Sequence, residues 1–165
     1  MHLLRDSSEE EKLVFDMLLK KGGKPSIPAR NGDQPIHCAI RQSKWLTFTR
    51  LLKVGATVHD RGANGRTVLH IAAKHNKAAL IEPLINLGAD PYAVDHDNWM
   101  PIHYAVHGQH SKVLSNLLNH TSITRQKWGL GNKVAIVPLS SVLHEDDTEV
   151  TRLLLDAGYD LGGKG

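Results

Sequence analysis

The sequence is poor in cysteine and in aromatic residues. Its single cysteine, Cys38, forms neither an internal disulfide nor a thiolate metal cluster, so nothing in the chain depends on an oxidising compartment. Aromatic residues make up only 5% of the chain, which leaves the core to Leu, Ile, Val and Ala. Such side chains suit closely packed helices better than a β-sandwich. We therefore expect a helical protein in a reducing cytoplasm.

Long apolar runs are also missing. No segment approaches the length of a transmembrane helix. The first apolar residues are followed at once by Glu9, Glu10 and Glu11, which is the wrong order for a secretory signal. These absences predict no membrane insertion and an intracellular location.

The usual signs of catalysis are absent as well. The glycines do not gather in a phosphate-binding loop, and no nucleophile, base and orienting group are brought together. Cys38 is expected to be a small apolar side chain that is packed or semi-exposed, and Asp146 and Asp147 are expected to cap a helix. The sequence therefore predicts no enzyme and no cofactor.

What the sequence does contain is a repeat. Residues 31–39 are followed 33 positions later by the similar residues 64–72, and after another 33 by residues 97–105. A period of this length is typical of stacked helical repeats. The second half of each copy keeps the phase with a pair of large apolar residues, which begins at Leu51, Leu84 and Leu117.

Incomplete copies flank these three. Residues 8–20 fit the outer helix of a first, truncated unit. A last copy, with its apolar pair at Leu154 and Leu155, is displaced by 37 residues rather than 33. The extra residues fall within 124–137, around Trp128, which predicts a longer loop there.

The segments Pro35-Ile36-His37-Cys38-Ala39 and Pro101-Ile102-His103-Tyr104-Ala105 resemble the Thr-Pro-Leu-His-x-Ala signature of the ankyrin-repeat family. The resemblance implies an all-α solenoid of stacked helix-turn-helix units with β-turn fingers. It divides one domain into units at about 1–30 (a cap), 31–63, 64–96, 97–133 with the longer loop, and 134–165 (a second cap). The chain departs from the signature at certain positions: the threonine is replaced at Gln34 and Met100, and the glycine between the helices at Ser43, Asn76 and Gln109.

The histidines invite a metal-site interpretation. His37, His70 and His103 recur once per repeat, about 10 Å apart along such a stack, which is too far to share a metal. The resemblance implies that each imidazole hydrogen-bonds the neighbouring turn. His103, His107 and His110 have a spacing that can chelate zinc, but no acidic residue or cysteine lies nearby to complete the site. We expect no metal, and we expect solvated histidines on the concave face.

In this family the ligand generally lies against the finger tips and the exposed side of the inner helices. By repeat phase, the candidate partner-binding residues are Arg41, Arg61, Arg66, Lys74, His75, His96, Trp99, Tyr104 and His107. This face is basic and carries two aromatic residues of the kind enriched at interface hot spots. It predicts a protein partner or an acidic peptide with a hydrophobic residue, bound to a monomer.

Two alternatives remain. The array is short, and its end resembles an outgoing loop, so the repeats are alternatively the recognition half of a larger effector or adaptor, such as a host-directed bacterial or viral protein. The basic face also suggests nucleic-acid binding, but the sequence has no reader motif and no row of stacking aromatics. Nucleic acid is therefore the weaker alternative.

Overall fold

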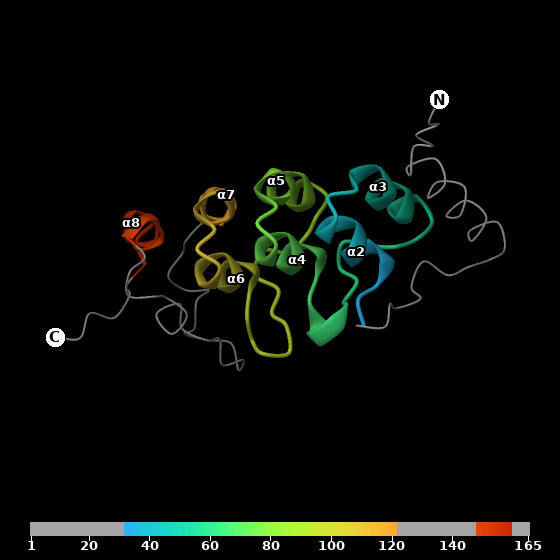
Figure 1. Ribbon diagram of the computed structural model, residues 1–165, viewed down its shortest axis with the longest axis horizontal. Coiled ribbons are helices and arrows are strands. Elements are labelled where there is room, and N and C mark those ends of the chain that lie inside the picture. Colours follow the sequence, from blue (N-terminus) through green and yellow to red (C-terminus); the bar gives the residue numbers. More distant parts are fainter. Residues whose placement is uncertain (1–31, 122–147, 160–165) are drawn as a thin grey trace, which may run out of the picture.

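The computed structural model describes residues 32–121 and 148–159, and in these residues the chain forms seven α-helices and no strand. The inner row of helices is α2 (Pro35–Arg41), α4 (Val68–Lys74) and α6 (Pro101–His107). The outer row is α3 (Trp45–Lys53), α5 (Ala78–Asn86), α7 (Ser111–His120) and α8 (Thr148–Asp156). Figure 1 shows the two rows side by side, with the loops between units below the inner row. The all-α prediction is confirmed.

The helices recur with the spacing of the sequence repeat. Pro35, Val68 and Pro101 open the inner helices at intervals of 33 residues. The outer helix α8 begins at Thr148, 37 residues after Ser111 opens α7, which matches the displacement expected for the last copy. The predicted cap at the beginning of the chain, the Trp128 loop, and the aspartates at 146 and 147 lie outside the described residues.

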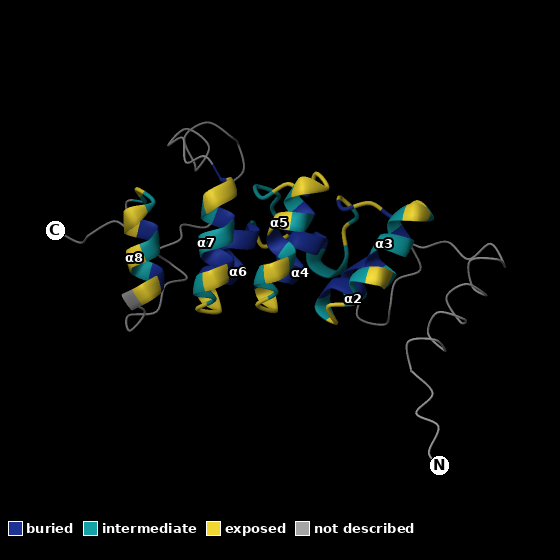
Figure 2. Ribbon diagram, turned by 90° about the horizontal axis from the view of Figure 1, so that it is seen from above, coloured by how far each residue is buried: buried dark blue, intermediate teal, exposed yellow. Residues whose placement is uncertain are grey.

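The core fills the space between the two rows. Leu51, Leu84 and Leu117 of the outer helices are almost completely buried, and each contributes about 1.5–3 kcal/mol by leaving water. Figure 2 shows α4 and α6 nearly all buried, whereas the outer helices leave one side exposed. Each helix pair packs on the next pair along the stack, so no unit buries its apolar face alone.

The turn between the two helices of a unit has a left-handed residue. Ser43, Asn76 and Gln109 have φ angles of 58°, 54° and 56°. These are the positions at which the signature has glycine, the residue that adopts this conformation without a steric cost. The substitutions noticed in the sequence therefore strain the backbone while the fold keeps its shape.

The histidine of each signature is buried and structural. The His37 Nε2–H donates to the carbonyl of Asp60 at 3.0 Å, and the His70 Nε2–H donates to the carbonyl of Trp99 at 2.9 Å. Both carbonyls belong to the finger that follows, so each imidazole joins one unit to the next. The predicted role of these two histidines is confirmed.

The fingers are also joined to one another. η1 (Ala63–Gly65) forms the tip of one finger, and the guanidinium of Arg61 bonds the carbonyls of Gly65 and Val94, both at 2.7 Å. The backbone N–H of His96 donates to the Asn64 carbonyl at 2.9 Å. The fingers therefore stand in a fixed row beside the inner helices.

Candidate functional site

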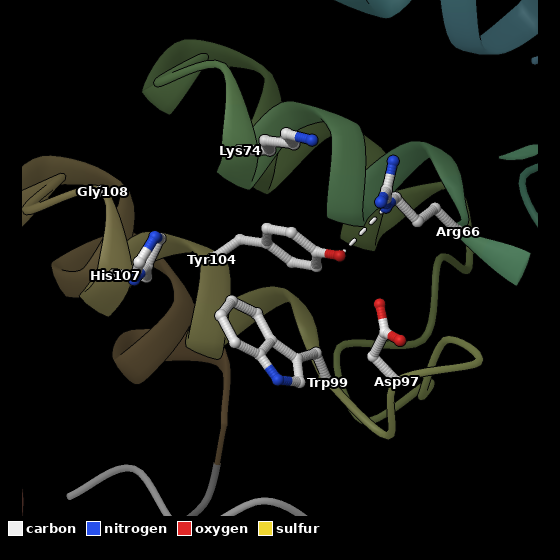
Figure 3. Close-up of a pocket in the computed structure, with 7 residues that line it drawn as sticks. All are labelled: Arg66, Lys74, Asp97, Trp99, Tyr104, His107 and Gly108. Carbon is white, nitrogen blue, oxygen red and sulfur yellow. Dashed lines mark hydrogen bonds between the residues drawn. The ribbon is translucent and has the colours of Figure 1, made fainter. Parts of the chain in front are cut away.

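A cavity of about 410 Å³ lies between the finger at residues 93–99 and the inner helices α4 and α6. The side chains that line it belong to Arg66, Lys74, Asp97, Trp99, Tyr104 and His107. Figure 3 shows the Tyr104 ring across the middle of this cavity, with its hydroxyl toward Arg66 and the Trp99 indole beside it. Every lining side chain except that of Asp97 was predicted from the sequence as partner-binding.

Tyr104 is the best-fixed side chain of the pocket. Only 8% of the residue is exposed. Its hydroxyl donates to Asp95 Oδ2 at 2.6 Å and accepts from Arg66 Nε at 2.9 Å. Burial, together with the hydrogen bond to Asp95, raises the pKa of Tyr104 to about 12. The phenol therefore stays protonated, and the direction of both hydrogen bonds is fixed.

Asp95 lies beneath the pocket and is buried. Its Oδ1 accepts the backbone N–H groups of Asp97 at 2.9 Å and Trp99 at 3.0 Å, while Oδ2 receives the Tyr104 hydroxyl. Arg66 Nε lies 3.9 Å from the same Oδ2. One carboxylate thus holds four of the pocket residues. Sequence reasoning missed Asp95 because the preceding finger has Gly62 in its place, so the repeat phase carries no sign of the carboxylate.

Trp99 forms an aromatic wall. The centroid of its ring lies 5.0 Å from that of Tyr104 and 5.5 Å from that of His107. The indole is partly buried against the core, so this wall is a rigid apolar surface. Rigid aromatic surfaces of this kind supply much of the binding energy at protein interfaces.

Two cations flank the Tyr104 ring. The Arg66 guanidinium carbon lies 5.6 Å from the ring centroid, and the Lys74 amine nitrogen lies 5.8 Å from it, which is within the range of cation–π attraction. Lys74, like Arg41 and His107, also lies in the last turn of its helix. A cation there stabilises the helix by about 0.3–1 kcal/mol, so part of the basic character has a structural explanation.

The remaining predicted residues lie outside the cavity. Arg41 pairs with Asp33 at 3.1 Å, and Arg61 is held by the two finger carbonyls described above. His75 and His96 are exposed. The structure therefore brings five of the nine predicted side chains into one pocket and leaves four on the surrounding surface.

The charges on this surface affect the pKa of His75. Desolvation lowers the pKa of its imidazole, and the neighbouring charges of Lys74, Arg41 and Lys77 lower it further, opposed by Asp33. Desolvation disfavours a charge of either sign, but the three neighbouring cations favour a negative charge. These cations therefore make the surface around His75 electropositive, and Asp33 offsets part of their effect.

His110 was placed wrongly from the sequence. It is half-buried rather than solvated, and its Nδ1–H donates to the carbonyl of Ala73 at 2.9 Å. The imidazole thus links the turn after α6 to the end of α4, so the turn of the third described unit contacts the second unit. No group of three or more metal-ligating side chains occurs in residues 32–121 and 148–159. Within the same residues, no helix has the length and apolar character needed to span a membrane.

Comparison with known proteins agrees with this architecture. A family model described as ankyrin repeats matches the chain in three copies, over residues 6–95 and 46–127. Ankyrin repeats are generally protein–protein interaction modules. No curated protein matches the chain. Since the family match extends from residue 6 to residue 127, well over half of the sequence, the chain belongs to the ankyrin-repeat family.

Proposed function

We propose that this chain is a non-enzymatic module that holds a segment of a partner protein on its concave surface. The surface consists of the pocket and the four predicted residues around it, and we call it the basic face: Arg41, Arg61, Arg66, Lys74, His75, His96, Trp99, Tyr104 and His107. The observation that carries the proposal is the pocket itself. It combines a rigid aromatic wall with two cations in a cavity of about 410 Å³, which is a size suited to one or two side chains of a peptide.

The preferred partner segment is acidic and carries a hydrophobic residue. The charges that lower the pKa of His75 favour an acidic segment. The Trp99 wall favours an apolar or aromatic side chain, since stacking on an indole adds to simple burial. The other elements of the proposal are a monomer with a single repeat domain, in the reducing cytoplasm that one unpaired cysteine suggests. The repeats serve either alone or as the recognition part of a larger effector or adaptor.

A peptide-display selection tests this function without knowledge of the natural partner. A library of random twelve-residue peptides is selected on the wild-type chain, and peptides that also bind an Arg66→Ala/Trp99→Ala variant are removed. We expect the surviving sequences to contain Asp or Glu beside an aromatic or large aliphatic residue.

The selection has a clear contrary result. Peptides that bind the variant and the wild type equally would contradict the binding function of this surface. Selected sequences without acidic enrichment would contradict only the preference for an acidic segment. A parallel selection against Leu46→Ala/Arg50→Ala, on the outer helix α3, controls for the loss of one cation and one large apolar side chain. That variant should remove none of the enriched peptides.

A further inference from the structure

We infer that the pocket is a receptor for one carboxylate, supplied by an Asp or Glu side chain of the partner, and that the buried Asp95 is the positioning residue that holds Arg66 ready for it. The inference rests on the proposed function and adds the chemistry of the pocket. It follows from which hydrogen-bonding groups of the pocket are already used and which remain available.

The acceptors around the pocket are already engaged. Both oxygens of Asp95 accept hydrogen bonds, Oδ1 from two backbone N–H groups and Oδ2 from Tyr104. Asp97 accepts from the side-chain amide of Asn64 with one carboxylate oxygen. The Tyr104 hydroxyl both donates and accepts. A ligand that offers donors would thus find the buried acceptors occupied, with only the exposed Asp97 carboxylate partly available.

The donors are free in the part of the chain that the structure describes. Arg66 uses Nε for the Tyr104 hydroxyl, and its two terminal nitrogens have no hydrogen-bond partner there. The Lys74 amine likewise has neither a hydrogen bond nor an ion pair with any described residue. The two side chains flank the Tyr104 ring from the same side of the cavity (Figure 3). The unused capacity of the pocket is therefore that of a cationic donor pair.

A single carboxylate fits this donor pair better than a phosphate does. With Nε engaged, Arg66 presents the end of its fork, two parallel N–H groups that match the two oxygens of a carboxylate. The local charge also matters, because Asp95 and Asp97 nearby weaken the attraction that the two cations exert on an anion. A second negative charge on the ligand would gain little here, and its desolvation would cost more.

Asp95 is what makes this arrangement specific to one finger. In the preceding finger the equivalent residue is Gly62, and the same backbone hydrogen bond still closes the turn, from Gly62 to Arg66 at 2.8 Å as from Asp95 to Trp99 at 2.9 Å. A carboxylate at this position is thus not needed to close the turn. Its side chain instead fixes Tyr104, and through Tyr104 the guanidinium of Arg66. Preorganised donors bind more tightly because less freedom is lost on binding.

Two small probes that differ by one group test the ligand chemistry. The ¹⁵N-labelled protein is titrated with 3-phenylpropionate and, separately, with 3-phenylpropionamide, and the Trp99 indole signal is followed by NMR. Trp45, which stacks on Phe48 away from the pocket, is the internal control. We expect the carboxylate to shift the Trp99 signal at millimolar concentration with an affinity at least about tenfold above that of the amide. Equal affinities, no shift with the carboxylate, or tighter binding of 2-phenylethylphosphonate would overturn the inference.

Two substitutions test the positioning role. Tyr104→Phe removes the hydroxyl between Arg66 and Asp95, and Asp95→Asn keeps an acceptor for the backbone N–H groups but removes the charge. We expect Tyr104→Phe to reduce the affinity for 3-phenylpropionate by about fivefold to tenfold, with little change for the amide, so that the ratio of the two affinities falls. For Asp95→Asn we expect a smaller fall, because the loss of a negative charge beside the bound anion opposes the loss of positioning. Glu82→Gln, which removes one negative charge from the exposed side of the outer helix α5, should leave this ratio unchanged. An unchanged ratio in both pocket variants would overturn the role of Asp95.

These results are separate from those of the display selection. If the selected peptides depend on Trp99 but do not require Asp or Glu, the protein-binding function survives and the carboxylate receptor fails. If the probes bind as expected but no peptide is enriched, the pocket chemistry holds and the proposed function fails.

Discussion

The first two described units have a buried histidine at the same position of the repeat, His37 and His70, but the two imidazoles differ in their hydrogen bonds. His70 uses both ring nitrogens: Nδ1 accepts the backbone N–H of Thr67 at 3.1 Å and lies 2.9 Å from the Thr67 hydroxyl, while Nε2 donates to the next finger. Among the described residues, His37 bonds the next finger, but its buried Nδ1 has no hydrogen-bond partner. Gln34 stands where Thr67 stands a unit later, and the third unit shows that a hydroxyl is not essential for pairing Nδ1, since the backbone N–H of Met100 donates to His103 Nδ1 at 3.0 Å.

This contrast shows that the repeats are equal in shape but unequal in stability. Both imidazoles are fully buried, so both lose their hydrogen bonds to water on folding. Only His70 replaces these with a hydrogen bond at each ring nitrogen. In a stack stabilised by neighbouring contacts, the weaker unit opens first. The second and third units, which form the pocket, should therefore stay folded when the first begins to open.

The largest expected effect is a loss of stability in acid. Burial lowers the pKa of His70 from 6.5 to about 4 and also lowers the pKa of His37. Between pH 6.5 and about pH 4, His70 is protonated in the unfolded chain but neutral in the folded chain. The contribution of the neutral imidazole to the free energy of unfolding is therefore fully present above pH 6.5 and is lost as the pH falls toward 4. The shift of His70 corresponds to about 3 kcal/mol. Urea unfolding of the wild type and of His70→Gln across this range measures it. Parallel pH dependence in the two proteins would contradict the assignment.

The next effect compares the two caps directly. Thr67→Ala removes the hydroxyl at the His70 ring and should reduce the free energy of unfolding by about 1–2 kcal/mol. Gln34→Ala removes a side chain that makes no cap bond and only an exposed hydrogen bond, 3.2 Å long, to the Arg61 carbonyl, so its cost should be about 0.5 kcal/mol. Urea unfolding at pH 7.5 measures both. Equal costs would show that the two units do not differ in the way described.

The converse substitution should improve the weaker unit. Gln34→Thr offers a hydroxyl to the orphaned Nδ1 of His37 and should raise the free energy of unfolding by about 1 kcal/mol. Hydrogen exchange of the α2 amides measures the effect locally, with the α6 amides as the reference. A gain spread evenly over both helices, or no gain, would contradict the local explanation.

The smallest effect concerns the left-handed turns. Gln109→Gly should add about 0.5–1 kcal/mol, because glycine removes the strain of a φ of 56° at some cost in chain entropy. Asn76→Gly should change stability by less than about 0.5 kcal/mol, because asparagine tolerates this conformation better. Thermal unfolding of the two variants gives the comparison. A larger gain at Asn76 than at Gln109 would be contrary to this account.

Much of the fold could be predicted from the sequence because residues of the same type recur at equivalent positions of each repeat. A period of 33 residues, a pair of large apolar residues in each outer helix and a histidine in the first turn of each inner helix locate the helices and their core. The same phase placed Trp99 and Tyr104 beside Arg66 and Lys74, although these residues lie in different units. Phase alone was enough for this, since equivalent positions in adjacent units are neighbours in a stack.

Contacts that break the repeat could not be predicted. Asp95 has glycine as its counterpart one unit earlier, so only the folded finger shows that its carboxylate reaches Tyr104. Arg61 was grouped with the partner-binding cations, but the structure shows its guanidinium bonded to two finger carbonyls. His110 was expected in solvent and instead bonds the preceding unit. Each of these contacts depends on the exact packing of one unit against the next, which cannot be predicted from a local sequence pattern.

The central claim is that the pocket on the basic face binds the partner, and isothermal titration calorimetry with a display-selected peptide tests it most directly. The account predicts that Arg66→Ala/Trp99→Ala, with its helical circular dichroism unchanged, loses at least about 1–2 kcal/mol of binding free energy, or roughly tenfold in affinity. The control Leu46→Ala/Arg50→Ala should bind within about twofold of the wild type, a difference below about 0.5 kcal/mol. A pocket variant that binds as tightly as the wild type would contradict the claim.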